Sequence, residues 1–536
     1  MNIPLTPLRF LRYASQQYPR KVGVICGEQR YTYSQFAERA ARLGGALRAL
    51  GVQPGDRVAF LSGNCHRLLE GYYGVLEAGA VLLPLNIRLT PHELAYILND
   101  SGAKVLLFQE QFAPMVDGFR AELKTVEGYV ALDHTPASWA FSQNYEQLLS
   151  SASPQQLEIT KVDENSLAEL FYTSGTSANP KGVMLTHRNI YLHALNVTIT
   201  FNTGADSVEL HTIPLFHANG WGVAHSLTYV GGTHVMIGKF DPPEVFRLIE
   251  REKVHACSLV PTMATALVHC PDRPKYDLSS LRRITLGGAA ASPTLVRQVE
   301  DRIGCICFSG YGLTETSPVL TTAQKKLGVN WEGDERFEGQ ARTGYALPGV
   351  EIRIVDSEDR DVPHDGQSIG EIIARSDGVM DGYWKQPEAT AEVMRGGWFH
   401  TGDMATMDEN GYILIVDRKK DIIVSGGENI SSLEVEKAML AHPAIYEVAV
   451  IPVPDPRWGE IPKALVALKP GVQATEQEIL DFTRSRLSHY KCPRSIEFMD
   501  TLPKTGTGKI LKKELRKKYW SGTESIRPEM ATKTSN

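Results

Sequence analysis

The chain has 536 residues, enough for two to four domains at about 150 residues each. Apolar residues make up 42% and charged residues 22%, which excludes a disordered, collagen-like or small disulfide-stapled protein. With a net charge of -6 and no apolar run of about 18 residues, we expect neither a nucleic-acid partner nor a membrane span.

The N-terminal segment has no signal-peptide core, although it carries three arginines in its first twenty residues. Leu8, Leu11 and Ala14 share one helical face, so we expect a docked helix; a transit peptide is the alternative. The seven cysteines are scattered without Cys-x-x-Cys spacing, which gives no indication of zinc or thioredoxin-like chemistry. We expect buried thiols and a cytoplasmic location.

Strands and amphipathic helices alternate through the first 400 residues. Thr32 and Gln35 have the spacing of a capping box, and Asp241 with Pro242 begins another helix. Short apolar strands separated by such helices are typical of a mostly parallel sheet covered on both faces, so the predicted class is α/β. The predicted strands of this part are 57–61, 105–108, 235–237, 256–260 and 284–286.

After Gly349 the pattern changes to short strands without intervening helices, at 350–356, 369–374 and 411–416. This pattern predicts an antiparallel or barrel-like β subdomain. The remainder, with a helix opened by Ser431, is predicted to be a small α+β unit that forms a separate domain.

Residues 172–182, Tyr-Thr-Ser-Gly-Thr-Ser-Ala-Asn-Pro-Lys-Gly, directly follow an apolar strand. Small hydroxyl residues, a glycine and a lysine supply the close N–H groups, hydroxyl donors and cation that a polyphosphate needs. No Gly-Lys-Ser/Thr closes the loop, so it is not a Walker A loop. By itself the loop fits a flexible turn as well as a phosphate site.

Three other segments add chemistry of the same kind. Residues 309–316 (Ser-Gly-Tyr-Gly-Leu-Thr-Glu-Thr) follow the predicted strand 305–308, at the end of a strand where α/β proteins bind ligands. Residues 398–403 place a carboxylate, Asp403, on a predicted turn, and residues 503–509 place a lysine on a glycine-rich loop.

Together with Asp-Arg-Lys-Lys-Asp at 417–421 and Ser-Gly-Gly-Glu-Asn-Ile at 425–430, these segments resemble the adenylate-forming enzymes. That superfamily contains acyl-CoA synthetases, adenylation domains and firefly luciferase. The resemblance implies a large N-terminal domain of α/β sheets with a barrel-like subdomain (1–418), a hinge (419–421) and a small mobile α+β C-terminal domain (422–536).

The resemblance also implies a two-step reaction. A carboxylate attacks the α-phosphorus of ATP, which gives an acyl-adenylate and pyrophosphate, and the thiol of coenzyme A then displaces AMP. Two anions meet in the first step, so the site needs positive charge and preorganised donors. The implied partners are ATP, Mg²⁺, coenzyme A and a small carboxylic acid, and self-association into a homodimer is left open.

Two other functions remain as alternatives: an acyl-AMP ligase or adenylation enzyme that loads a carrier protein, and a catalytically silent nucleotide-binding relative. Under the resemblance, Lys509 bridges the carboxylate and the α-phosphate, Thr314 binds the α-phosphate and Glu315 ligates Mg²⁺. Tyr311 stacks on adenine and Asp403 accepts a ribose hydroxyl; the alternatives are a core tyrosine and a surface turn. The full predicted ATP/AMP set is Thr173, Ser174, Gly175, Thr176, Lys181, Gly288, Ala289, Ala290, Tyr311, Gly312, Thr314, Asp403, Ile415 and Arg418.

Residues 214–222, Pro-Leu-Phe-His-Ala-Asn-Gly-Trp-Gly, resemble the acyl-pocket segment of synthetases for short and medium aliphatic acids and of methylmercaptopropionate-CoA ligases. His217 would gate the carboxylate end, as a catalytic residue, and Trp221 would floor the acyl channel, which favours short or medium acids. A structural histidine is the alternative for His217. The other implied positions are the hinge residue Lys420 and the CoA contacts Gly426, Gly427, Trp458 and Tyr490.

Overall fold

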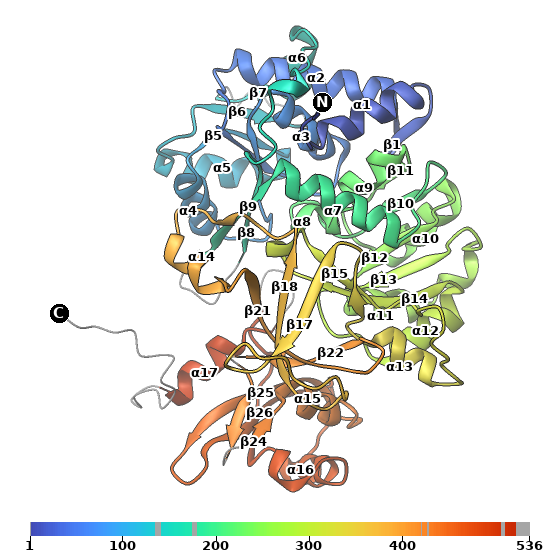
Figure 1. Cartoon of the computed structure of the whole chain (residues 1–536), viewed down its shortest axis with the longest axis vertical. Helices are drawn as coiled ribbons and strands as arrows, with labels where there is room; N and C mark the ends of the chain where they lie inside the picture. The colour runs from blue at the N-terminus through green and yellow to red at the C-terminus, as the bar shows by residue number, and fades with distance from the viewer. Residues whose placement is uncertain are drawn as a thin grey trace, which may run out of the picture. The chain divides into compact units, whose positions relative to one another are not determined.

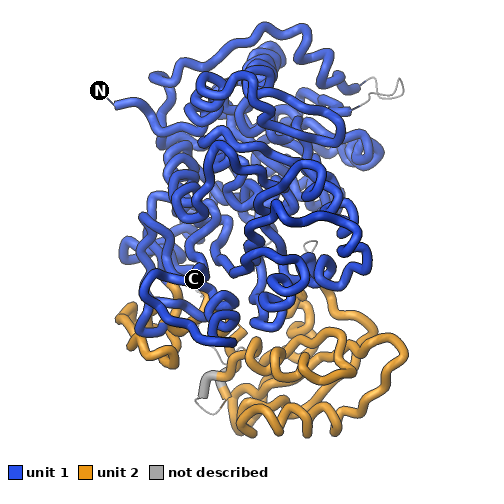
Figure 2. Tube along the Cα trace, turned by 90° about the vertical axis from the view of Figure 1, so that its right-hand side faces the viewer, with its two compact units in different colours: residues 1–353, 373–401, 408–414 blue, residues 354–372, 402–407, 415–536 orange. Residues whose placement is uncertain are grey.

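The computed structural model of the chain describes residues 2–133, 141–173, 179–419, 421–425, 428–504 and 510–520 (Figure 1). They form two compact units, coloured separately in Figure 2. Unit 1 comprises residues 1–353, 373–401 and 408–414, and unit 2 comprises residues 354–372, 402–407 and 415–536. Unit 2 thus includes segments that precede residue 418. The predicted domain boundary after residue 418 and the predicted hinge at 419–421 describe how one part of the chain moves against another. They therefore remain predictions.

Two large sheets, in which most neighbouring strands run parallel, form the framework of unit 1. The nine-stranded sheet has the order β16 (Tyr345–Ala346), β15 (Val319–Thr322), β14 (Ile306–Gly312), β13 (Arg283–Leu286), β12 (Ala256–Leu259), β10 (Val208–His211), β11 (Thr233–Met236), β1 (Val22–Cys26) and β2 (Gln29–Thr32). The eight-stranded sheet has the order β19 (Gly382–Tyr383), β9 (Lys181–Thr186), β8 (Leu167–Thr173), β4 (Val81–Pro84), β3 (Arg57–Leu61), β5 (Ala103–Phe108), β6 (Gly128–Ala131) and β7 (Gln143–Asn144).

Every residue of β4 and β11 is buried, which explains why strands of this kind appear in the sequence as short, continuous apolar runs. Helices connect the strands, and Figure 1 shows α1, α2 and α3 beside one another. The predicted class, α/β, is confirmed. The helices of unit 1 are α1 (Leu8–Gln17), α2 (Tyr33–Ala49), α3 (His66–Glu77), α4 (Pro91–Ser101), α5 (Ala113–Phe119), α6 (Tyr145–Ser151), α7 (His187–Thr200), α8 (Ala218–Trp221), α9 (Val223–Val230), α10 (Pro242–Glu252), α11 (Pro261–Val268), α12 (Pro293–Ile303), α13 (Glu335–Ala341) and α14 (Pro387–Val393).

The helix starts agree with the local sequence signals. Thr32 and Gln35 form the reciprocal capping box that opens α2, and the Asp241 side chain caps α10 ahead of its N-terminal proline. Helix α1 buries Leu8, Leu11 and Ala14, so the prediction of a docked N-terminal helix is confirmed. No helix in the described part of the chain combines the length and the apolar character that crossing a bilayer requires.

The predicted group of short strands after Gly349 is a five-stranded sheet, across which the division between the two units is drawn. Its order is β17 (Val350–Val355), β18 (Gly370–Ser376), β21 (Trp398–Met407) and β20 (Met394–Arg395), with β22 (Ile413–Arg418) paired to β21. The small α+β unit contains β23 (Ile423–Ser425), β24 (Glu428–Ile430), α15 (Ser432–Leu440), β25 (Ile445–Asp455), β26 (Gly459–Leu468), α16 (Glu476–Arg484), β27 (Ser495–Phe498) and α17 (Lys512–Trp520).

Candidate functional site

The predicted phosphate loop connects two antiparallel strands. Thr173, the last residue of β8, lies opposite Lys181, the first residue of β9. Hydrogen bonds between these strands fix the two ends of the loop next to each other. Ser174, Gly175 and Thr176 lie outside the described residues. The Lys181 ammonium lies 4.8 Å from the centroid of the Tyr383 ring, which is a cation–π contact.

Tyr383 connects Lys181 with Glu315. The Tyr383 hydroxyl donates a hydrogen bond to Oε1 of Glu315 at 2.9 Å, and the Met380 N–H donates to the Glu315 backbone carbonyl at 2.8 Å. Burial, followed by the charge of Glu315, raises the pKa of Tyr383, so the phenol keeps its proton and remains a donor. Two residues singled out independently from sequence, Lys181 and Glu315, are therefore brought together. No sequence motif indicated the role of Tyr383.

The strand that was predicted to end at residue 308 continues as β14 to Gly312, because its last residues pair with β15. Tyr311 thus lies on a strand rather than after one, and its main chain lies opposite Thr321. A Cβ atom added to Gly312 would lie 1.7 Å from the Pro318 carbonyl oxygen, so only glycine fits there. Thr314 follows in a short 3-10 turn (Thr314–Thr316), where it is buried.

The predicted adenine wall and the predicted acyl floor are adjacent. A Cβ atom added to Gly287 would lie 2.8 Å from Cη2 of Trp221, and one added to Gly288 would lie 3.5 Å from its Cζ2. The indole ring therefore packs against the backbone that follows β13. Ala289 and Ala290 are exposed. A side chain at Gly287 would overlap the ring, so glycine at that position leaves room for it, whereas a Cβ at Gly288 would lie at an ordinary contact distance.

His217 precedes the short helix α8 and is exposed to solvent, although protein surrounds it on most sides. That surrounding protein, together with the positive charge of Arg88, lowers the pKa of His217. The imidazole is therefore neutral at pH 7 and can offer one donor and one acceptor. Arg88 was not predicted, because it lies far from residue 217 in the sequence.

In unit 2, Arg418 and Asp403 form an ion pair in which Nε of the arginine lies 3.0 Å from Oδ1 of the aspartate. Asp403 is buried and lies on strand β21, so the predicted turn is wrong, and so is the alternative of a surface turn. The misreading comes from Gly402, whose φ of +71° is a turn-like feature inside the strand. Ile415 lies with Arg418 on the neighbouring strand β22 and is half-buried.

The two predicted contacts for the nucleotide of coenzyme A are both exposed. Trp458 lies between β25 and β26, with the Arg457 guanidinium 4.8 Å from its ring centroid. Tyr490 lines a pocket of about 300 Å³ with Arg484 and Arg494. The predicted residues Lys420, Gly426, Gly427 and Lys509 lie outside the described residues.

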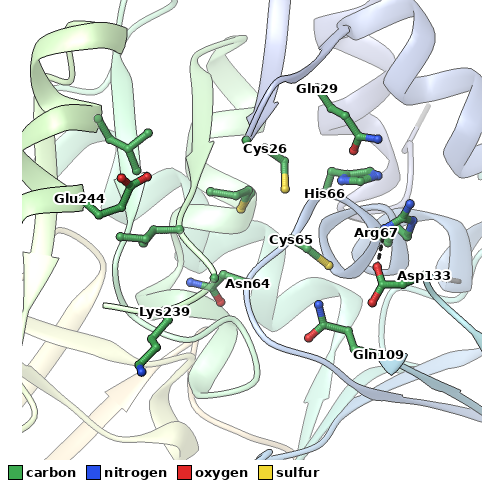
Figure 3. Close-up of a pocket in the computed structure, with 15 residues that line it drawn as sticks. Cys26, Gln29, Asn64, Cys65, His66, Arg67, Gln109, Asp133, Lys239 and Glu244 are labelled. Atoms are coloured by element: carbon green, nitrogen blue, oxygen red, sulfur yellow. Dashed lines mark hydrogen bonds and ion pairs between the residues drawn. The ribbon is translucent and has the colours of Figure 1, made fainter. Parts of the chain in front are cut away.

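A cavity of about 380 Å³ lies at the carboxyl ends of β1, β3, β5, β6 and β11 (Figure 3). Cys26, Cys65 and His66 line it, and the Arg67 guanidinium there pairs with Asp133 at 2.9 Å. Of the described lining residues, none belongs to the predicted site. The cavity is therefore a feature separate from the predicted ATP and acyl residues.

The site can be compared with known proteins. A model of the AMP-binding enzyme family matches residues 11–384, and a model of the AMP-binding enzyme C-terminal domain matches residues 434–509. The 4-hydroxybutyrate–CoA ligase 2 of Metallosphaera sedula is 37% identical, over 96% of this chain and 94% of its own. The long-chain-fatty-acid–CoA ligase of Thermus thermophilus is 38% identical, over 95% of each chain.

Among solved structures, the anthranilate CoA ligase AuaEII in complex with anthranoyl-AMP superimposes with a TM-score of 0.85 at 28% sequence identity. The match covers 97% of this chain and 98% of that chain. The resemblance to adenylate-forming enzymes is confirmed over nearly the whole length. The chain belongs to the AMP-binding enzyme family, as a CoA ligase that activates a carboxylic acid with ATP.

Proposed function

We propose that this ligase acts on a short- or medium-chain apolar carboxylic acid. The observation that carries the proposal is the packing of the Trp221 indole against the backbone of Gly287 and Gly288. A large ring held there shortens the acyl channel, and no charged side chain of the 214–222 segment would pair with a second acidic group. The two relatives described above act on acids of very different length at nearly equal identity, so local geometry is the better guide.

In this proposal, different residues of unit 1 bind different parts of ATP. Thr173 and Lys181 hold its β- and γ-phosphates, Thr314 binds the α-phosphate and Tyr311 stacks on adenine opposite Gly288. Lys181 supplies positive charge close to Glu315, with Tyr383 between them. This arrangement places a cation, a carboxylate and a hydroxyl donor in one short stretch, which suits transfer of a charged phosphoryl group.

The donor set around Glu315 fits Mg²⁺. Among the described residues there is no group of three or more His, Cys, Asp or Glu side chains arranged to hold a metal ion. Mg²⁺ is commonly held by one or two carboxylates together with substrate phosphates and water, which a single glutamate beside a phosphate loop provides. Glu315 would hold the ion, which when bound neutralises phosphate charge; Tyr383 keeps the carboxylate oriented.

The remaining roles fall on unit 2. Asp403 accepts hydrogen bonds from the ribose hydroxyls while Arg418 pairs with that carboxylate and orients it, with Ile415 on the same strand as Arg418. Lys509 bridges the acid and the α-phosphate, and Lys420 is the hinge.

The acceptor is coenzyme A, and the proposed path of its pantetheine arm passes Gly426 and Gly427. Exposed Trp458 and the basic pocket around Tyr490 offer stacking and positive charge, which suit the nucleotide end of coenzyme A.

A chain-length series tests the proposed acid class. We expect pyrophosphate release to be faster with short and medium acids than with long ones, because one methylene in an apolar pocket changes the rate by about 10–200-fold. Trp221→Ala should move the optimum to longer acids. The matched control is Trp331→Ala, which deletes an indole that packs against Gly339 instead. An optimum at long chains in the unmodified enzyme would contradict the proposal.

The same assay addresses the acceptor. AMP release that requires free coenzyme A supports the CoA ligase, whereas an adenylate that accumulates regardless of coenzyme A would indicate a carrier protein as acceptor.

We also propose a cytoplasmic location, because all seven cysteines are free thiols and five of them are buried. Whether two chains associate as a homodimer is measured by light scattering during the same preparation.

A further inference from the structure

Residues 218–222 form a left-handed turn, which is rare in proteins. All five have positive φ: 45° for Ala218, 43° for Asn219, 61° for Gly220, 60° for Trp221 and 84° for Gly222. Glycine adopts such angles freely and asparagine tolerates them, but alanine and tryptophan do so at a cost in free energy. The turn therefore persists only because its surroundings hold it.

Asn219 holds the turn from within. Its Oδ1 accepts a hydrogen bond from the Gly222 N–H at 2.7 Å, and its Nδ2 donates to Oε2 of Glu169 at 3.3 Å. The other carboxylate oxygen of Glu169 accepts from Nε2 of His225 at 2.6 Å. Glu169 is fully buried and Asn219 and His225 are 1% exposed, so these bonds do not compete with bulk water.

The backbone that precedes the turn is held by two more buried side chains. Nδ2 of Asn64 donates to the carbonyls of His211 and Ile213, at 2.7 and 2.9 Å, and its Oδ1 accepts from the Leu215 N–H at 2.7 Å. The Tyr72 hydroxyl donates to the Leu215 carbonyl at 2.6 Å. Side chains thus satisfy backbone groups that an irregular buried segment would otherwise leave unpaired.

Glu169 also connects this segment with the phosphate loop. It lies on β8, the strand that ends at Thr173, where the loop begins. The turn carries Trp221 and begins directly after His217, the two residues of the proposed acid site. One carboxylate therefore anchors the acid-binding turn to the strand that positions the triphosphate.

We propose that Glu169, through Asn219 and His225, is a positioning residue that sets the conformation of the acid-binding turn and thereby the acid specificity. Glu169 does not touch the substrate; it fixes the angle at which the turn presents Trp221. The inference rests on the proposed function of His217 and Trp221. It adds that the specificity of this pocket is controlled from a buried residue behind it.

Glu169→Gln tests the proposal, because a glutamine has the same shape but cannot accept hydrogen bonds at both terminal atoms. We expect the KM for the acid to rise about tenfold, the equivalent of one weakened charged hydrogen bond, while the KM for ATP changes less than about twofold. The chain-length profile should also become broader. The matched control is Glu70→Gln, an equally buried glutamate that binds Arg39 and Tyr145 instead.

Asn219→Gly is the second variant, in case Glu169→Gln does not fold. Glycine accepts the left-handed angle but lacks both side-chain bonds, so it should reproduce the rise in acid KM and the broader profile. A folded Glu169→Gln or Asn219→Gly enzyme with the KM and chain-length profile of the unmodified protein would overturn the inference. Failure of the proposed function itself looks different: the unmodified enzyme would then prefer long acids.

Discussion

Two regions of the molecule use polar side chains in opposite ways. In unit 1 the turn at 218–222 is held by a frame of buried hydrogen-bonding side chains around the Glu169 carboxylate: the uncharged Asn64, Tyr72 and Asn219, together with His225. In unit 2 the residues beside the predicted hinge are charged and paired: Arg418 with Asp403, Lys419 with Glu371, Arg516 with Asp421, and Lys512 with Glu436.

The difference follows from the directionality of the two interactions. A neutral hydrogen bond is lost over a small change of angle, so a buried frame of such bonds fixes one geometry. An ion pair depends mainly on distance and is screened by water and salt, so partly exposed pairs tolerate rearrangement. Unit 1 is built to hold a strained turn, whereas the charged pairs of unit 2 suit a segment that is predicted to bend.

The largest expected effect is the response of unit 1 to acid. Burial lowers the pKa of His66, His193 and His211 to about 3 and that of His187 to about 4. The pKa values of these histidines in the folded protein lie below the ordinary value of 6.5 in the unfolded chain. Their contribution to the free energy of unfolding is therefore fully present above pH 6.5, and it is lost below pH 6.5 as the unfolded chain takes up protons. Between pH 7 and pH 5, each of these histidines should lower the free energy of unfolding by about 2 kcal/mol. Calorimetry at both values tests this, and an unchanged melting temperature would contradict it.

Asp403→Asn should have the next largest effect, on the nucleotide. The change removes the charge that Arg418 pairs with and weakens the proposed bonds to ribose, so we expect the KM for ATP to rise about 10- to 100-fold. The KM for the acid should stay nearly constant. Glu351→Gln is the control, because it breaks an exposed pair with Arg375 in unit 1. A rise in the KM for the acid alone would contradict the role of Asp403.

Tyr383→Phe should have a smaller effect, since it removes one hydroxyl and keeps the ring beneath Lys181. Without the hydrogen bond to Glu315, the carboxylate is less well oriented, and we expect adenylation to slow about three- to tenfold. The requirement for Mg²⁺ should shift to higher concentration in a pyrophosphate-release assay and in isothermal titration of Mg²⁺ and ATP together. An unchanged Mg²⁺ dependence would show that the hydroxyl does not support Glu315.

Lys419→Ala should have the smallest effect. Its ammonium lies 3.3 Å from Glu371 and is nearly half exposed, so the pair is worth at most about 0.5 kcal/mol. The free energy of unfolding of the variant, measured by urea denaturation, should therefore be close to that of the unmodified protein. High salt should abolish the remaining difference. Lys161→Ala, which breaks an exposed pair with Glu158, is the control. A loss of several kcal/mol would mean that this part of unit 2 is as rigidly specified as the frame in unit 1.

Local signals predicted much of the fold. The capping box at Thr32 and the cap at Asp241 marked helix starts correctly, because the atoms involved are three residues apart. The same local reasoning placed Asp403 on a turn, since Gly402 has the conformation of one, whereas pairing between β21 and β22 makes it a strand. Strand β21 also pairs with β18, which ends more than twenty residues before it in the sequence, so this pairing leaves no local signal.

The sequence by itself determined the α/β class, the order of the motifs and the chemistry that they share, because glycine, lysine, hydroxyl and carboxylate spacing reflects what a phosphate needs. Only the tertiary structure decided that Tyr383 joins Lys181 to Glu315, that Trp221 packs on Gly287, and that Glu169 holds the turn behind it. These contacts join residues that are 50 or more positions apart, as with Asn219 and Glu169. Their energy comes from burial and from angles that a linear pattern does not contain.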